Sequence, residues 1–279
     1  MAAQLAFLLQ DALDPAITDE SLTAQLLADW PDLDPSRLTT GDPRERAETA
    51  EDGPVIVHYD GTMIALMSVP APVGDDLAEI AQHSRLWPKD APVPVDYGAH
   101  TVVSAFTADA AGHDALVAQA ALLSKAVSSL IALSESIRAV YWGAAAHVIL
   151  PALFRDLALS TLPAPLLPAW VALNVGARPD GVLTGHSLGL DQLGVKDIEI
   201  PQSQEDAASV LDRLAGIAEY QLQHGPVIGD GDTIGSVSDA EVVARHQPSA
   251  IGDERIVLSL SFIGTEPAPV KKKGFFRRR

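Results

Sequence analysis

The sequence predicts an α+β fold with mainly antiparallel sheets, and three observations lead to this prediction. Predicted strands and helices follow the order β-α-β-β-α-β in the first part of the chain and again in the second. Asp60-Gly61 lies between two apolar runs and is a strong signal for an antiparallel hairpin. A long apolar stretch at residues 109–136 separates the two sets and predicts a buried helix.

The first set of elements occupies residues 1–108 and predicts an N-terminal half. Thr18 is suited to cap a helix that carries Leu22 and Leu26 on one side and ends near Trp30. Residues 34–53 are polar and predict an exposed loop. The other predicted elements are strands at 4–9, 54–58, 63–69 and 100–106 and a helix at 74–86. This order is that of a ferredoxin-like unit.

The second set occupies residues 137–264 and predicts a C-terminal half with additional strands. Ser203 is expected to cap its longest helix, which runs to Gln223 before Gly225. The predicted elements are helices at 151–159 and 203–223 and strands at 138–143, 169–177, 181–184, 197–200, 227–234, 240–245 and 254–263. We therefore expect two ferredoxin-like halves joined by the 109–136 helix and followed by a flexible basic tail at 265–279.

Composition excludes several classes of site. The chain of 279 residues has no cysteine, which excludes disulfides, zinc–thiolate sites, iron–sulfur clusters and cysteine nucleophiles. The first residues carry no basic group before their apolar run, unlike a signal peptide. The longest apolar stretches are interrupted by polar residues and are interpreted as buried elements rather than membrane spans. We expect a cytoplasmic protein.

Charge is distributed unevenly along the chain. The net charge is −18, but the last nine residues contain six basic residues and no acid. The other 270 residues hold 13 basic and 37 acidic residues, a net charge of −24. Such a body repels phosphate backbones, so we expect no nucleic-acid binding by the folded part.

One histidine lies in a segment of glycines and small polar residues, Thr184-Gly185-His186-Ser187-Leu188-Gly189. A histidine beside a hydroxyl group can serve as a base next to a nucleophile, which makes His186 a candidate catalytic residue. Adjacent residues on a strand point to opposite faces, however, and no G-x-S-x-G elbow is present. The alternative interpretation is a glycine-rich bend that positions the next strand.

Two acidic pairs are further candidates. Asp197 and Glu199 alternate with isoleucines on a predicted strand, so they form either an acid/base pair or part of a solvated strand face. Asp230 and Asp232 resemble the start of a calcium loop, but Ile234 stands where a third ligand is needed. The alternative is a β-turn. No cofactor-binding motif is present, and we expect no cofactor.

The C-terminal tail combines basic and aromatic side chains. Its contact residues are Lys271, Lys272, Lys273, Phe275, Phe276, Arg277, Arg278 and Arg279. Basic residues with aromatic neighbours suit weak contact with an anionic membrane or an acidic partner. The alternative is a disordered, solubilising end.

Three motifs of the second half are distinctive in combination: T-G-H-S-L-G-L from Thr184, G-V-K-D-I-E-I from Gly194 and G-D-G-D-T-I-G from Gly229. Together they resemble a bacterial family of unknown function. The resemblance is clearest over residues 180–263 and more diffuse from residue 5. It implies no activity and no catalytic residues.

Three functional hypotheses follow from the sequence. The first is a non-enzymatic binding or accessory protein of inhibitor or immunity type, whose acidic body masks a basic protein partner. The second is a hydrolase or metal-assisted enzyme that uses His186 with nearby carboxylates. The third is a peripheral membrane or assembly factor that uses the tail.

Overall fold

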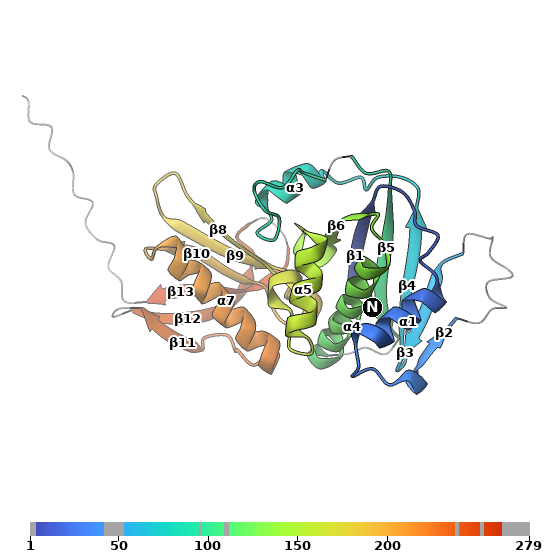
Figure 1. Ribbon diagram of the computed structural model, residues 1–279. Helices are drawn as coiled ribbons and strands as arrows, with labels where there is room; N and C mark the ends of the chain where they lie inside the picture. Colours follow the sequence, from blue (N-terminus) through green and yellow to red (C-terminus); the bar gives the residue numbers. More distant parts are fainter. Residues whose placement is uncertain are drawn as a thin grey trace, which may run out of the picture.

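The protein is a mixed α+β structure with two mainly antiparallel sheets, which confirms the predicted class (Figure 1). The computed structural model describes residues 4–41, 53–94, 96–108, 112–237, 240–251 and 254–263. The first sheet has seven strands in the order β2-β3-β4-β5-β1-β6-β7, and the second has six in the order β11-β12-β13-β10-β9-β8. Only β10 and β13 pair in parallel among these described strands.

The bounds of the elements are as follows. The first sheet contains β1 (Gln4–Gln10), β2 (Leu38–Thr40), β3 (Val55–Tyr59), β4 (Thr62–Val69), β5 (Ala99–Thr107), β6 (Ile137–Trp142) and β7 (His147–Ile149). The second contains β8 (Ala172–Ala177), β9 (Leu183–Leu188), β10 (Ile198–Ser203), β11 (Thr233–Val237), β12 (Ala240–Pro248) and β13 (Ile256–Ile263). The helices are α1 (Asp19–Asp29), α3 (Leu77–His83), α4 (His113–Leu133), α5 (Pro151–Thr161), α6 (Leu167–Trp170) and α7 (Ala207–His224), with 3-10 turns η1 (Pro35–Arg37), η2 (Gly143–Ala145) and η3 (Asp191–Leu193).

Local signals explain several of these elements. Thr18 caps α1, where its side chain accepts a hydrogen bond from the backbone N–H of Ser21. Asp60 and Gly61 both have positive φ, 49° and 79°, as a two-residue hairpin between β3 and β4 requires. The cap of α7 is Asp206 rather than Ser203, because the Asp206 side chain accepts from the N–H of Ser209.

One helix covers the second sheet at close range. In Figure 1, α7 lies across the strands of this sheet. A Cβ atom at Gly185 of β9 would lie 2.9 Å from Val210 and 3.0 Å from Leu214, both on α7. The absence of a side chain at Gly185 therefore allows the helix to approach the sheet.

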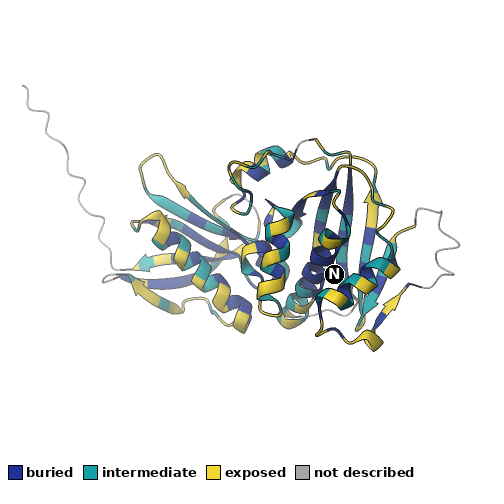
Figure 2. Ribbon diagram, viewed as in Figure 1, coloured by how far each residue is buried: buried dark blue, intermediate teal, exposed yellow. Residues whose placement is uncertain are grey.

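Helix α4 is the buried helix that the sequence predicts between the two sets of strands. Ala120, Leu123 and Val127 are fully buried, whereas Leu116 and Ile131 remain partly accessible. Figure 2 shows α4 buried along most of its length, while α1, α5 and α7 each keep an exposed side. By length and composition α4 could also cross a membrane, but here it packs against β1, β5, α1 and α5.

The strand order differs from the one expected for the N-terminal half. In a split β-α-β unit, one strand lies between the two parallel strands that flank a helix. Here both β4 and β5 lie between β3 and β1, so β1 and β3 run in opposite directions. The strand order therefore does not support the ferredoxin-like description of this half.

The boundary between the halves also differs from the expected one. Residues 137–149 form β6 and β7, which extend the first sheet through pairing with β1, although they were expected to begin the C-terminal half. The expected loop at 34–53 contains η1 and β2, and the expected strand at 227–234 begins only at Thr233. The pairing of β6 with β1 joins residues about 130 positions apart in the sequence. Such pairing has no local signal, so the apolar pattern alone could not assign β6 to a sheet.

We predict that Leu123→Ala lowers the free energy of unfolding by about 2–5 kcal/mol, because it leaves a cavity in the core at a fully buried position. Urea unfolding followed by circular dichroism measures the change. Leu159 on α5 is 42% exposed and provides the matched control. Leu159→Ala should change the free energy by at most about 0.5 kcal/mol. A loss below about 1 kcal/mol for Leu123→Ala would show that α4 is peripheral.

Candidate functional site

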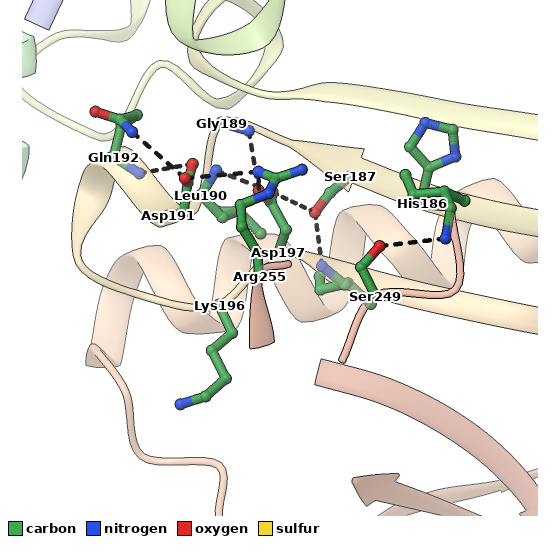
Figure 3. A network of polar contacts seen from close by, with 12 residues as sticks. His186, Ser187, Gly189, Leu190, Asp191, Gln192, Lys196, Asp197, Ser249 and Arg255 are labelled. Carbon is green, nitrogen blue, oxygen red and sulfur yellow. Dashed lines mark hydrogen bonds and ion pairs between the residues drawn. The ribbon is translucent and has the colours of Figure 1, made fainter. Parts of the chain in front are cut away.

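A network of polar contacts surrounds the turn between β9 and β10 (Figure 3). The chain leaves β9 at Leu188, reverses through Gly189 and η3, and enters β10 at Ile198. Gly189 has a φ of 116°, and a Cβ atom there would lie 2.5 Å from the carbonyl oxygen of Trp170. Only glycine fits this conformation and this close approach, so the glycine-rich bend expected from the sequence is present.

Asp197 is the centre of this network. Its side chain is 3% exposed. Its Oδ1 atom accepts hydrogen bonds from Ser187 Oγ at 2.8 Å and from the N–H of Leu190 at 3.1 Å. Its Oδ2 atom accepts from the N–H of Gly189 at 3.4 Å and from the Arg255 guanidinium at 2.9 Å. The carboxylate therefore ties both ends of the β9–β10 turn to the start of β13.

Burial raises the pKa of Asp197 to about 6, and the nearby charge of Asp191 acts in the same direction. The hydrogen bonds from Ser187 and Leu190 and the charge of Arg255 oppose this rise. Burial is the largest of these effects because it removes water from the charged form.

Glu199 is the second buried carboxylate of this region, with 3% of its surface exposed. Its Oε1 atom accepts a hydrogen bond from Ser249 Oγ, and its Oε2 atom accepts from the N–H of Ala250 at 2.9 Å. Ser249 and Ala250 belong to the connection between β12 and β13. The interpretation of Asp197 and Glu199 as a solvated strand face is therefore wrong, because this connection and the β9–β10 turn cover them.

His186 lies on β9, opposite Glu199 on β10 and Asn174 on β8. Its Nε2 atom is 3.2 Å from the Asn174 side-chain nitrogen. Burial lowers the pKa of His186, the charge of Glu199 raises it, and the charge of Arg255 lowers it. The environment thus favours the neutral imidazole.

The turn that contains Asp230 and Asp232 lies apart from His186. Asp232 Oδ2 accepts from the N–H of Gly229 at 2.7 Å, and Asp230 Oδ1 accepts from the N–H of His246 on β12 at 2.9 Å. Two strands, β13 and β10, separate β12 from β9, a distance of about 14 Å at ordinary strand spacing. The hydrogen bonds support the interpretation as a β-turn, and the structure does not bring the two candidate groups together.

Within the described residues, no group of three His, Asp or Glu side chains is placed to hold a metal ion. The tail contact residues Lys271–Arg279 lie outside the described residues.

A cavity of about 500 Å³ lies between the parts of the molecule built on the two sheets. Its walls come from α3 and the segment after it, from η2 and β7, and from α6, β8 and α7. Most of its lining is apolar, with Ile80, Leu86, Leu167, Leu188 and Leu211 among its members. The volume falls in the range of ligand-binding pockets, about 300–1,000 Å³.

Sequence reasoning missed the donors that complete this region. Ser187 and Arg255 hold Asp197, and Ser249 holds Glu199. His113, at the start of α4, was also missed: its ring nitrogens lie 2.7 Å from the carbonyl oxygen of Leu193 and 3.0 Å from that of Leu222. Ser187 adjoins a candidate residue, but the other partners are distant in sequence and carry no local signal.

Comparison with known protein families gives a match over part of the second half of the chain. Residues 186–261 match a family described as Domain of unknown function (DUF4261), which confirms the predicted resemblance to a family of unknown function. The matched segment begins at His186 on β9 and ends within β13, so it contains the Asp197 and Glu199 contacts and α7. No curated protein and no solved structure matches the chain.

We predict that the effect of Asp197→Asn depends on pH. The pKa of Asp197 is about 6 in the folded protein and 3.8 in the unfolded chain, so proton binding favours the folded state. This contribution to stability is complete below pH 3.8 and is lost as pH rises through 6. Asparagine does not titrate. The destabilisation caused by Asp197→Asn should therefore be larger at pH 4 than at pH 7.5, by at most about 3 kcal/mol.

Urea unfolding of both proteins at the two pH values measures this difference. Asp206→Asn is the control, because Asp206 is an exposed helix cap whose pKa is lowered by its hydrogen bonds to Ser209. Its effect should not grow at pH 4. An equal loss at both pH values for Asp197→Asn would contradict the raised pKa.

Proposed function

We propose that the protein is a cytoplasmic, non-enzymatic binding protein whose partner is another protein with a basic surface. The observation that supports this proposal most is that the oxygens of the candidate catalytic carboxylates already have hydrogen-bond donors within the protein. Both oxygens of Asp197 and both oxygens of Glu199 accept hydrogen bonds from the protein itself.

A carboxylate that acts as a general base must reach the proton it abstracts. Asp197 and Glu199 are almost fully buried, and each holds a connection of the second sheet. Their contacts fit a structural role. Asp230 and Asp232, the other candidate acids, bind backbone N–H groups in a turn.

The charge of the chain supports a basic partner. The net charge is −18, and the 270 residues before the last nine carry −24. A surface with this charge accelerates association with a basic protein and disfavours acidic competitors. Masking of a basic surface is how an inhibitor or immunity-type protein would act.

The test is capture of proteins from a lysate of the source cells on the immobilised full-length chain. Because exposed charges are screened as salt rises, we expect a basic protein to be retained stoichiometrically at about 50 mM salt and released at about 500 mM. His186→Ala should retain the same protein to the same extent. Failure of the chain to retain any protein at low salt would contradict the proposal.

Two further variants separate the alternatives. A chain without residues 271–279 should still retain the partner, because the acidic body makes the contact. If deletion abolishes retention while the intact chain sediments with anionic vesicles, the tail mediates function as a membrane or assembly factor. If His186→Ala instead abolishes hydrolysis of a substrate by the purified chain, the protein is an enzyme.

A further inference from the structure

We infer that β8 is a docking edge, to which an extended segment of the partner protein with apolar and basic side chains adds as a further strand. This inference rests on the proposed function and names the surface that would carry it. The juxtaposition that supports it is an unprotected sheet edge beside the cavity of about 500 Å³.

The two sheets end in four edge strands within the described part of the chain, and three of these are protected. Strand β2 is only three residues long. Strand β7 is also three residues long, and its outer side is occupied: the N–H of Val148 donates to Ser84 Oγ at 2.8 Å, and the N–H of Leu150 donates to the Leu86 carbonyl oxygen at 3.2 Å. Short or covered edges resist pairing with other chains.

The third protected edge is β11. Its pairing with β12 shifts register between Thr233 and Gly235, and Gly235 has a φ of 150°. An irregularity of this kind bends the edge and interrupts the row of backbone groups that another strand would need.

Strand β8 has none of these protective features. Its six residues, Ala172–Ala177, pair with β9 without a register shift, and they include no proline and no charged residue. No other described strand pairs with its outer side. Natural sheets usually protect such edges with charges, prolines or bulges, and an unprotected regular edge is suited to strand addition.

The register identifies which backbone groups face outward. The N–H of Arg178 donates to the carbonyl oxygen of Val182 at 2.9 Å, so this pair is hydrogen-bonded across the hairpin. Hydrogen-bonded and non-hydrogen-bonded pairs alternate along an antiparallel ladder. The backbone N–H and C=O groups of Leu173, Val175 and Ala177 therefore point away from β9.

The cavity adjoins the first residues of this edge. It is lined by Leu173 and Asn174 of β8 and, from the first part of the molecule, by Ile80, Leu86 and His147. Because residues of the first part of the molecule face the first residues of β8 across this cavity, a segment added at this end of the strand would contact both.

The lining also indicates the chemistry of the added segment. The cavity offers apolar contacts from Leu167, Leu188 and Leu211, which suit an apolar side chain next to Leu173. Glu79 and Asp212 lie on different walls, with Arg85 as the basic residue of the lining besides the histidines. Together with the net charge of −18, these acids favour basic residues flanking the apolar one.

The test uses a phage library of random 12-residue peptides selected on the full-length chain. Selected peptides should share an apolar residue flanked by basic ones. Their affinities are then measured by fluorescence anisotropy for the wild type, Val175→Pro and Val175→Thr. Val175→Pro removes one outward N–H, so we expect at least about a tenfold loss of affinity. Val175→Thr keeps the N–H and the branched shape and should bind within about twofold.

N-methylated peptides make the same test on the unaltered protein, in case Val175→Pro does not fold. Methylation of alternate backbone nitrogens should abolish binding in one register and spare it in the other, because only alternate N–H groups face β8. Selection of no peptide, equal binding to Val175→Pro, or insensitivity to methylation would overturn the inference. Dimerisation that Val175→Pro abolishes would also overturn it, in favour of self-association.

The two proposals fail in different ways. If the captured partner binds Val175→Pro as well as it binds the wild type, the protein is a binding protein with another docking surface. If no partner is captured but peptides add to β8, the edge is competent and the proposed function is wrong.

Discussion

Two buried carboxylates on and just before β10 hold the second sheet together, and the surrounding connections depend on them. Asp197 accepts hydrogen bonds from the N–H groups of Gly189 and Leu190 in the β9–β10 turn. It also accepts one from the side chain of Arg255, directly before β13. Glu199 holds the β12–β13 connection through Ser249 and Ala250. Burying a carboxylate costs free energy, and donors to every carboxylate oxygen reduce this cost. At Asp197 burial remains the larger effect, because its pKa is raised to about 6.

The same turn attaches the second sheet to the first. Gly189 packs against the carbonyl oxygens of Trp170 and Ala144. The Gln4 side chain of β1 donates to the carbonyl oxygen of Gln192 at 2.7 Å. His113 joins the start of α4 to η3 and to the end of α7. These contacts join the β9–β10 turn and η3 to η2, β1 and α4.

The elements that could be predicted from sequence are those with local signals. Thr18 and the Asp60-Gly61 turn act through neighbouring backbone groups, and α4 is apolar over its own length. The pairing of β6 with β1 joins residues far apart and could not be foreseen. The alternation of Asp197 and Glu199 with isoleucines is the same whether water or protein covers the acidic side. Protein covers the acidic side because Ser249, Ala250 and Arg255 contact these carboxylates. These three residues lie some fifty positions later in the sequence.

Hydrogen exchange measured by mass spectrometry on Glu199→Ala tests the structural role of these carboxylates most directly. Loss of the acceptor should free the N–H of Ala250 and speed exchange at residues 249–251 and in β13, which pairs with β10 at Ser259. Exchange in the β3–β4 hairpin, which belongs to the other sheet, should not change. Unchanged exchange at 249–251 and in β13 would contradict the account and show that Glu199 is not an anchor of the fold.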